Sequence, residues 1–144
     1  MLRPPTEGED IVADYTTLGL TLGRHPLALL RRRLTARGIV SAMELQARSH
    51  GSQAYTAGLV ICRQRPSSAN GVVFVTLEDE TGHINLIVWQ RIAAQARRAL
   101  LGAHLLAARG TIQRQDGVLH LVAQRLEDLS GWLGALAPRS RDFC

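Results

Sequence analysis

The residues best suited to chemistry lie between 72 and 89, where two alternating patterns flank a turn at 79–82. Successive residues of a strand point to opposite faces of a sheet, so each pattern sorts its residues into two sets. One set is aliphatic and suits a core: Val73, Val75, Leu77, Ile84, Leu86 and Val88. The other set includes two aromatic rings, a hydroxyl and an amide, and its members are Phe74, Thr76, Glu78, Asn85, Ile87 and Trp89. A face of this kind can stack and hydrogen-bond flat ligands such as unpaired bases.

Three arginines and a histidine extend this candidate site. Arg63 and Arg65 flank the first loop, Arg114 flanks the last turn, and His120 is predicted on the outer face of the last strand. Guanidinium groups at such positions can pair with phosphates or stack on bases. The simpler alternatives stay open at this stage. Each arginine could be a solvated surface charge, either ring could cover a barrel end, and Asn85 could be a solvated strand amide.

The sequence offers no catalytic or metal-binding motif. The acidic run at 78–80 lies at a hairpin turn, where Asp and Gly serve backbone geometry. The five histidines lack zinc-ligand spacing, and Cys62 and Cys144 are the two cysteines. Neither a Ser/His/Asp set, a phosphate loop nor a dinucleotide fingerprint is present. We therefore expect no catalytic residue, no metal and no cofactor.

Composition points to a polyanionic partner. The 144 residues have a formal net charge of +5 and a sequence pI near 10.5, and all 17 basic residues are arginine. A GC-rich genome explains the missing lysines but not the excess over 12 acidic residues. Two cysteines indicate a reducing compartment rather than a disulfide framework. With no membrane-length apolar run and a polar, acidic start, we expect a soluble, cytoplasmic protein.

The predicted elements have the order of a known barrel. Helices are expected over 26–37, with Arg31–Arg33 on its exposed side, and over 41–48, where Ser41 and Glu44 match a capping box. Strands are expected over 55–64, 72–78 and 83–89, a helix over 90–101, then strands over 105–114 and 118–126. Gly58 and Gly110 suit bends. Three strands, a helix and two strands predict a mainly β protein with a helical N-terminal extension, built on a five-stranded OB-fold barrel. The expected division is a lead-in over 1–52, the barrel over 53–128 and a C-terminal helical turn and tail over 129–144.

Several linked segments resemble one protein family. They are AGLVICRQRP at 57–66, FVTLEDETG at 74–82 and NLIVW at 85–89, preceded by DYTTLGLTLGRHP at 14–26 and followed by GTIQR at 110–114, LEDL at 126–129 and SRDF at 140–143. They resemble the C-terminal OB domain of bacterial error-prone DNA polymerases, C-family enzymes related to the polymerase III alpha subunit. Cys144 departs from the usual ending of that family. The resemblance implies a nucleic-acid-binding module of a translesion polymerase used in DNA repair.

The resemblance also implies what this chain lacks. The catalytic palm, the fingers and the metal-binding domain of the family lie upstream, so we expect this chain to be a fragment, a split polypeptide or a detached reading frame without catalytic activity of its own. The leading hypothesis is a single-stranded DNA-binding domain that holds the template near a polymerase core. The alternatives are a protein-interaction barrel that tethers the polymerase to repair partners, and an RNA- or tRNA-binding OB module.

Overall fold

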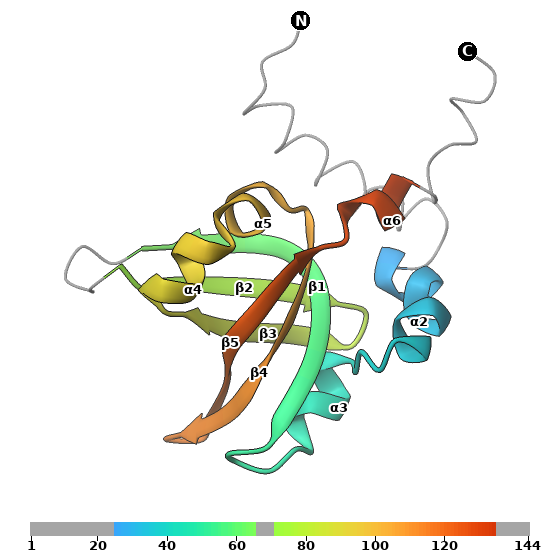
Figure 1. Ribbon diagram of the computed structural model, residues 1–144. Coiled ribbons are helices and arrows are strands. Elements are labelled where there is room, and N and C mark those ends of the chain that lie inside the picture. Colours follow the sequence, from blue (N-terminus) through green and yellow to red (C-terminus); the bar gives the residue numbers. More distant parts are fainter. Residues whose placement is uncertain (1–24, 66–70, 135–144) are drawn as a thin grey trace, which may run out of the picture.

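A computed structural model describes residues 25–65 and 71–134 and shows a closed five-stranded barrel with short helices around it (Figure 1). The strands follow the order β1-β2-β3-β5-β4, and every neighbouring pair is antiparallel except the parallel pair β3 and β5. This architecture confirms the predicted OB-fold. The strands are β1 (Gln53–Gln64), β2 (Val73–Asp79), β3 (Gly82–Val88), β4 (Leu105–Gln115) and β5 (Val118–Asp128). The helices are α2 (Pro26–Ala36), α3 (Ala42–Gln46), α4 (Gln90–Gln95), α5 (Arg97–Gly102) and α6 (Ser130–Gly134).

The two N-terminal helices begin and end at the residues that local chemistry favours. Pro26 occupies the first turn of α2, and the His25 Nδ1 atom accepts the Leu27 N–H at 3.0 Å. Gly38, with φ of +84°, follows the helix end. In α3 the predicted capping box is confirmed: Ser41 accepts the Glu44 N–H, and the Glu44 carboxylate accepts the Ser41 N–H.

The helix expected over 90–101 is two helices that meet at Ala96, where φ is −111° and ψ is 33°. A straight helix of that length would be about 18 Å long. The bend instead allows Ile92 and Ala93 of α4 and Leu100 of α5 to bury against the barrel interior. The spacing of the hydrophobic residues therefore correctly predicted helical structure with an inward side, but the prediction of one continuous helix was wrong.

The molecule has two hydrophobic cores. The first fills the barrel and includes Ala42 and Leu45 of α3 as well as the inward residues of all five strands. The second lies outside the barrel, where α2 and α6 cover one side of β1 and β4 (Figure 1). Its members are Leu27, Leu30, Leu34, Ile39, Ala57, Leu59, Leu105, Ala107, Leu129 and Leu133. The runs 57–61 and 105–108 are continuously apolar, which is typical of strands buried on both faces.

Two strand irregularities set which side chains point outward. In β4 the register shifts between Arg109 and Gly110, and a Cβ on Gly110 would lie 2.0 Å from the Val122 carbonyl oxygen. In β1 the register shifts between Val60 and Cys62, a few residues after the predicted bend at Gly58. Ile61 is the extra residue of this bulge, which therefore changes the alternation for the rest of β1.

Membrane spanning by helices finds no support in the described residues, since none of their helices is both long and apolar enough to cross a bilayer.

Candidate nucleic-acid interface

The predicted aromatic residue Phe74 lies on the outside of the barrel. Strand pairing places Gln64 of β1, Phe74 of β2, Ile87 of β3 and Val122 of β5 side by side in one row across four strands. Phe74 is 36% exposed, whereas its neighbours Val73 and Val75 are buried in the barrel. The ring therefore lies on the outer surface, between an amide and two aliphatic side chains.

A second row, more polar than the first, runs beside it. Thr76 pairs with Cys62 on one side and with Asn85 on the other. The parallel pair of β3 and β5 sets Leu86 opposite Leu121, and the same offset brings Asn85 beside His120. The side chains of Cys62, Thr76, Asn85 and His120 are at least partly exposed. The row offers a hydroxyl, an amide and an imidazole for hydrogen bonds to a flat ligand.

We call this surface the outer face and define it by Gln64, Phe74, Thr76, Asn85, Ile87, His120 and Val122 of these rows, together with Trp89 directly after β3. Trp89 follows β3 two residues after Ile87 and is 53% exposed at the start of α4. Its members carry no carboxylate; the nearest acidic residue along β2 is Glu78, which lies near His25 and His83 at 3.7 and 3.6 Å. Glu78 follows Thr76 on the same side of β2, so the carboxylate lies at the edge of this surface, whereas the part around Phe74 is neutral and partly aromatic and suits stacked bases.

Positive charge borders one end of the outer face. Arg65 is exposed directly after β1, and it lines an open hollow together with Arg97, Leu100 and Leu101 of α5. Arg97 was not singled out from the sequence. The sequence predicted a helix in this segment but did not indicate that Arg97 lines the same hollow as Arg65.

Arg63, predicted to contact phosphates, has its guanidinium group engaged elsewhere. The β1 bulge pairs Arg63 with the buried Val75, so it does not share a side with Phe74. Its Nε and Nη2 atoms donate to the carbonyl oxygens of Leu100 and Ala103 at 2.6 and 2.7 Å. Burial lowers the pKa of this guanidinium, which nevertheless stays charged at physiological pH. Arg63 thus stabilises the C-terminal end of α5.

Arg114, also predicted to contact phosphates, likewise donates to backbone carbonyl oxygens. Its Nη2 atom donates to the carbonyl oxygens of Gln46 and Arg48, the latter at 2.9 Å, and its backbone N–H donates to His50 Nδ1. It therefore stabilises the C-terminal end of α3. The outer face brings together Phe74, Thr76, Asn85, Trp89 and His120, with Arg65 at its border, and leaves Arg63 and Arg114 outside.

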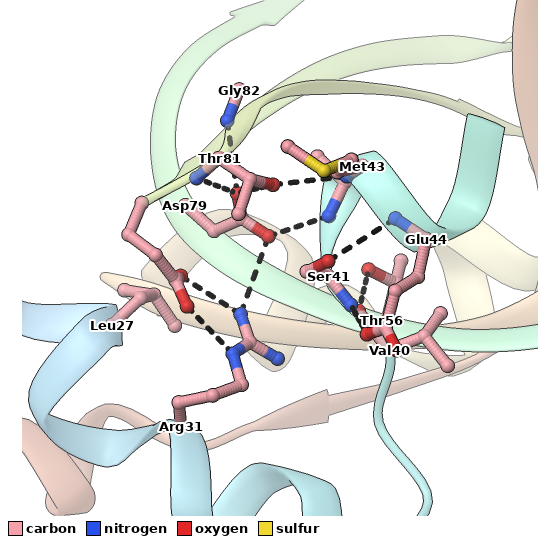
Figure 2. A network of polar contacts seen from close by, with 12 residues as sticks. Leu27, Arg31, Val40, Ser41, Met43, Glu44, Thr56, Asp79, Thr81 and Gly82 are labelled. Carbon is pink, nitrogen blue, oxygen red and sulfur yellow. Dashed lines mark hydrogen bonds and ion pairs between the residues drawn. The ribbon is translucent and has the colours of Figure 1, made fainter.

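The acidic turn between β2 and β3 forms a structural network (Figure 2). The buried Asp79 accepts hydrogen bonds from the Ala42 N–H at 2.7 Å and from both the N–H and the hydroxyl of Thr81. The Glu80 carboxylate accepts two hydrogen bonds from Arg31, at 2.7 and 2.9 Å. Burial opposes ionisation of Glu80, but these hydrogen bonds outweigh it and lower its pKa. The turn thus ties the hairpin to α2 and α3.

This network corrects the expectation that Arg31 lies on the exposed side of its helix, whereas Arg32 and Arg33 are exposed as expected. Arg31 lies inward on the acidic turn, and the Arg33 guanidinium lies 4.0 Å from the centroid of the Trp132 ring. Neither partner is near in sequence, which is why helical spacing did not indicate them. Within residues 25–65 and 71–134, no three His, Cys, Asp or Glu side chains are grouped so that they could hold a metal ion.

The closed barrel and its outer face define a class of protein. The family model described as "OB-fold nucleic acid binding domain" matches residues 35–129, and the chain belongs to this family. Nearly its whole length is similar to error-prone DNA polymerases, which confirms the predicted resemblance. Identity is 59% over 143 residues with the enzyme of Methylococcus capsulatus and 61% over 142 residues with that of Alkalilimnicola ehrlichii. Each alignment covers 99% of this chain and 14% of the relative, so the chain spans about one seventh of their length.

Solved structures support the fold. Asparaginyl-tRNA synthetase from Pyrococcus horikoshii, complexed with asparaginyl-adenylate, aligns with a TM-score of 0.52 at 17% identity, over 63% of this chain and 22% of that one. The p204 HINb domain aligns with a TM-score of 0.53 at 17% identity, over 66% of this chain and 49% of that one. At these identities the likeness concerns the barrel architecture.

Proposed function

We propose that this chain binds single-stranded DNA across its outer face. The observation that carries the proposal is the Phe74 row, in which an exposed ring lies between Gln64 and Ile87 and no member of the row is a carboxylate. Bases stack on aromatic rings with about 1–3 kcal/mol per base. Thr76 and Asn85 in the next row can hydrogen-bond base edges, and Arg65 and Arg97 can neutralise phosphates at the border.

The similarity to error-prone polymerases supports a role for this binding. We propose that the domain works beside a polymerase catalytic core in the cytoplasm, where it holds the template strand during translesion synthesis in DNA repair. This chain alone would then bind DNA without incorporating nucleotides, since the relatives are far longer than the segment it matches.

RNA is the second candidate ligand, because the matching family model carries the name tRNA_anti-codon. Stacking on Phe74 and Trp89 does not distinguish DNA from RNA, whereas contacts to the 2′-hydroxyl do. None of the residues of the outer face identifies such a contact. Competition between DNA and RNA strands of the same sequence therefore decides between the two ligands.

The proposal is tested by titrating labelled oligo-dT with purified protein and following fluorescence anisotropy at about 50 and 200 mM salt. Phe74→Ala should weaken binding by about 1–3 kcal/mol, which is about 5- to 150-fold, at both salt concentrations, because stacking releases no counterions. Arg65→Gln should weaken binding mainly at low salt and reduce the slope of log affinity against log salt.

Met43→Ala is the matched control. Met43 is a large apolar side chain, 66% exposed, on α3 and outside the outer face, so its removal should leave DNA affinity unchanged. Unchanged affinity of a folded Phe74→Ala variant would refute the proposed face. If neither Phe74→Ala, Arg65→Gln nor the salt concentration changes the affinity for oligo-dT, the result would instead favour the protein-interaction barrel.

A further inference from the structure

A second cationic surface lies on the side of β4 and β5 beyond the outer face. Arg109 and Arg125 are both exposed and are direct partners across the antiparallel β4–β5 pair. Like charges placed opposite each other destabilise a sheet. Among the described residues, neither guanidinium takes part in an ion pair. Two facing arginines without a carboxylate partner form a ready site for an anion.

Aromatic rings hold the surrounding arginines in place. The Arg109 guanidinium lies 4.5 Å from the centroid of the Tyr55 ring, its neighbour on β1. The guanidinium groups of Arg33 on α2 and of Arg37, which directly follows α2, lie 4.0 and 5.6 Å from the ring centroid of Trp132 on α6. A guanidinium held against a ring loses less freedom when it binds a ligand, and its planar fork matches a phosphate.

The two acidic side chains near this surface already accept hydrogen bonds from other groups. The Glu127 carboxylate accepts from Arg37 Nη2 at 3.1 Å and from the Tyr55 hydroxyl at 3.0 Å. The Asp128 carboxylate accepts the Ser130 N–H at 2.8 Å.

We define the arginine–aromatic cluster by its members: Arg33, Arg37, Tyr55, Arg109, Arg125, Glu127 and Trp132. Arg37, Tyr55, Arg109, Arg125 and Glu127 also line one open hollow.

Strand pairing connects this cluster with the outer face. The row that holds Phe74, Ile87 and Val122 continues to Thr111 of β4, and Arg109 lies two residues before Thr111. Phe74 and Thr111 are three strand spacings apart, which is roughly 15 Å around the barrel. Strands of about 4–16 nucleotides occupy known OB-folds, so one strand can reach from Phe74 to Arg109.

We propose that the arginine–aromatic cluster binds the phosphodiester backbone of a single strand where that strand leaves the outer face, an inference that rests on the proposed function. The continuity of the row favours a nucleic acid over an acidic peptide. Short strands then contact only the outer face, and longer strands contact the arginines as well.

The test compares oligo-dT strands of about 4 and 16 nucleotides, at the two ends of the OB-fold range. The double variant R109Q/R125Q should lower affinity for the long strand several-fold at low salt and leave the short strand unchanged. Its slope of log affinity against log salt should fall by up to about 1.4 units, at about 0.7 per lost phosphate contact. R109K/R125K keeps the charge without the planar fork and should lose less.

The matched control is R32Q/R48Q, which removes the same charge from two exposed arginines outside the cluster. An equal loss in this control, or an equal loss for both strand lengths, would overturn the cluster as a local site. Phe74→Ala separates the two proposals, because it should weaken both lengths. If it weakens both and R109Q/R125Q matches its control, only the cluster assignment fails; if it weakens neither, the proposed function fails.

Poly-glutamate serves as the competing ligand. Binding of poly-glutamate that R109Q/R125Q abolishes, with long-strand DNA binding unchanged, would overturn the proposal in favour of an acidic peptide. Thermal unfolding of each variant shows that the fold is intact, and exposed arginine substitutions should change stability by no more than about 0.5 kcal/mol.

Discussion

Replacing Asp79 with asparagine should destabilise the whole domain through one hydrogen bond. Asp79 Oδ1 accepts from the N–H and the hydroxyl of Thr81 and from the Gly82 N–H, whereas Oδ2 accepts from the Ala42 N–H at 2.7 Å (Figure 2). Asparagine has a single acceptor oxygen, which the three donors of the turn retain. Its NH2 group then faces the Ala42 N–H, and two donors meet in a buried site.

The magnitude follows from this contact. A buried N–H that loses a charged acceptor costs about 1.5–3 kcal/mol. Arg31 adds little, because its distance to Asp79 is already 3.4 Å and it keeps both hydrogen bonds to Glu80. Asp79→Asn should therefore lower the free energy of unfolding by about 2–3 kcal/mol. Asp79→Ala also loses the turn contacts and should lower it by roughly 1 kcal/mol more.

Urea denaturation at neutral pH measures these changes, with the m-value as a check that the two-state transition is preserved. Glu80→Gln is the matched control, since Glu80 belongs to the same turn but is partly exposed and should cost no more than about 1 kcal/mol. An Asp79→Asn variant as stable as the parent, or as stable as Glu80→Gln, would refute the assignment of Ala42 N–H as the decisive contact.

Three further predictions concern the barrel and its ends. Gly110→Ala should destabilise by about 3 kcal/mol, the upper end of overpacking, because its Cβ would meet the Val122 carbonyl at 2.0 Å; Gly102→Ala, with open space around it, is the control, and equal urea midpoints would contradict the close approach. Arg63→Met should cost about 1–2 kcal/mol through the lost hydrogen bonds to the end of α5. It should leave the salt dependence of DNA binding intact, and a flatter slope in the titration would show a phosphate contact instead. Burial, aided by the charge of Arg63, lowers the pKa of His104, so the unfolded chain binds the proton more readily and stability should fall as pH drops below about 6.5. His104→Gln should reduce this fall in thermal unfolding, and an unchanged pH profile would contradict the assignment.

The order of the elements and the identity of the outer face were accessible from the sequence. Alternation with a period of two is a local property, and it separates Phe74, Thr76 and Asn85 from the aliphatic residues between them. The turn between β4 and β5 is local too, since Asp116 and Gly117 adopt φ of 55° and 78° as a tight hairpin requires. These signals predicted the barrel because each lies within a few residues of chain.

The partners of the arginines were decided by the tertiary structure. Arg63 reaches α5 because a bulge at Ile61 changes the alternation of β1, and Arg31 reaches the acidic turn 48 and 49 residues away. Arg109 and Arg125 face each other because β4 and β5 pair in a shifted register. A guanidinium group binds whichever acceptor the fold brings near it. The sequence therefore determined that the chain is basic and forms an OB-fold, whereas strand register and helix packing decided which arginines remain available to a ligand.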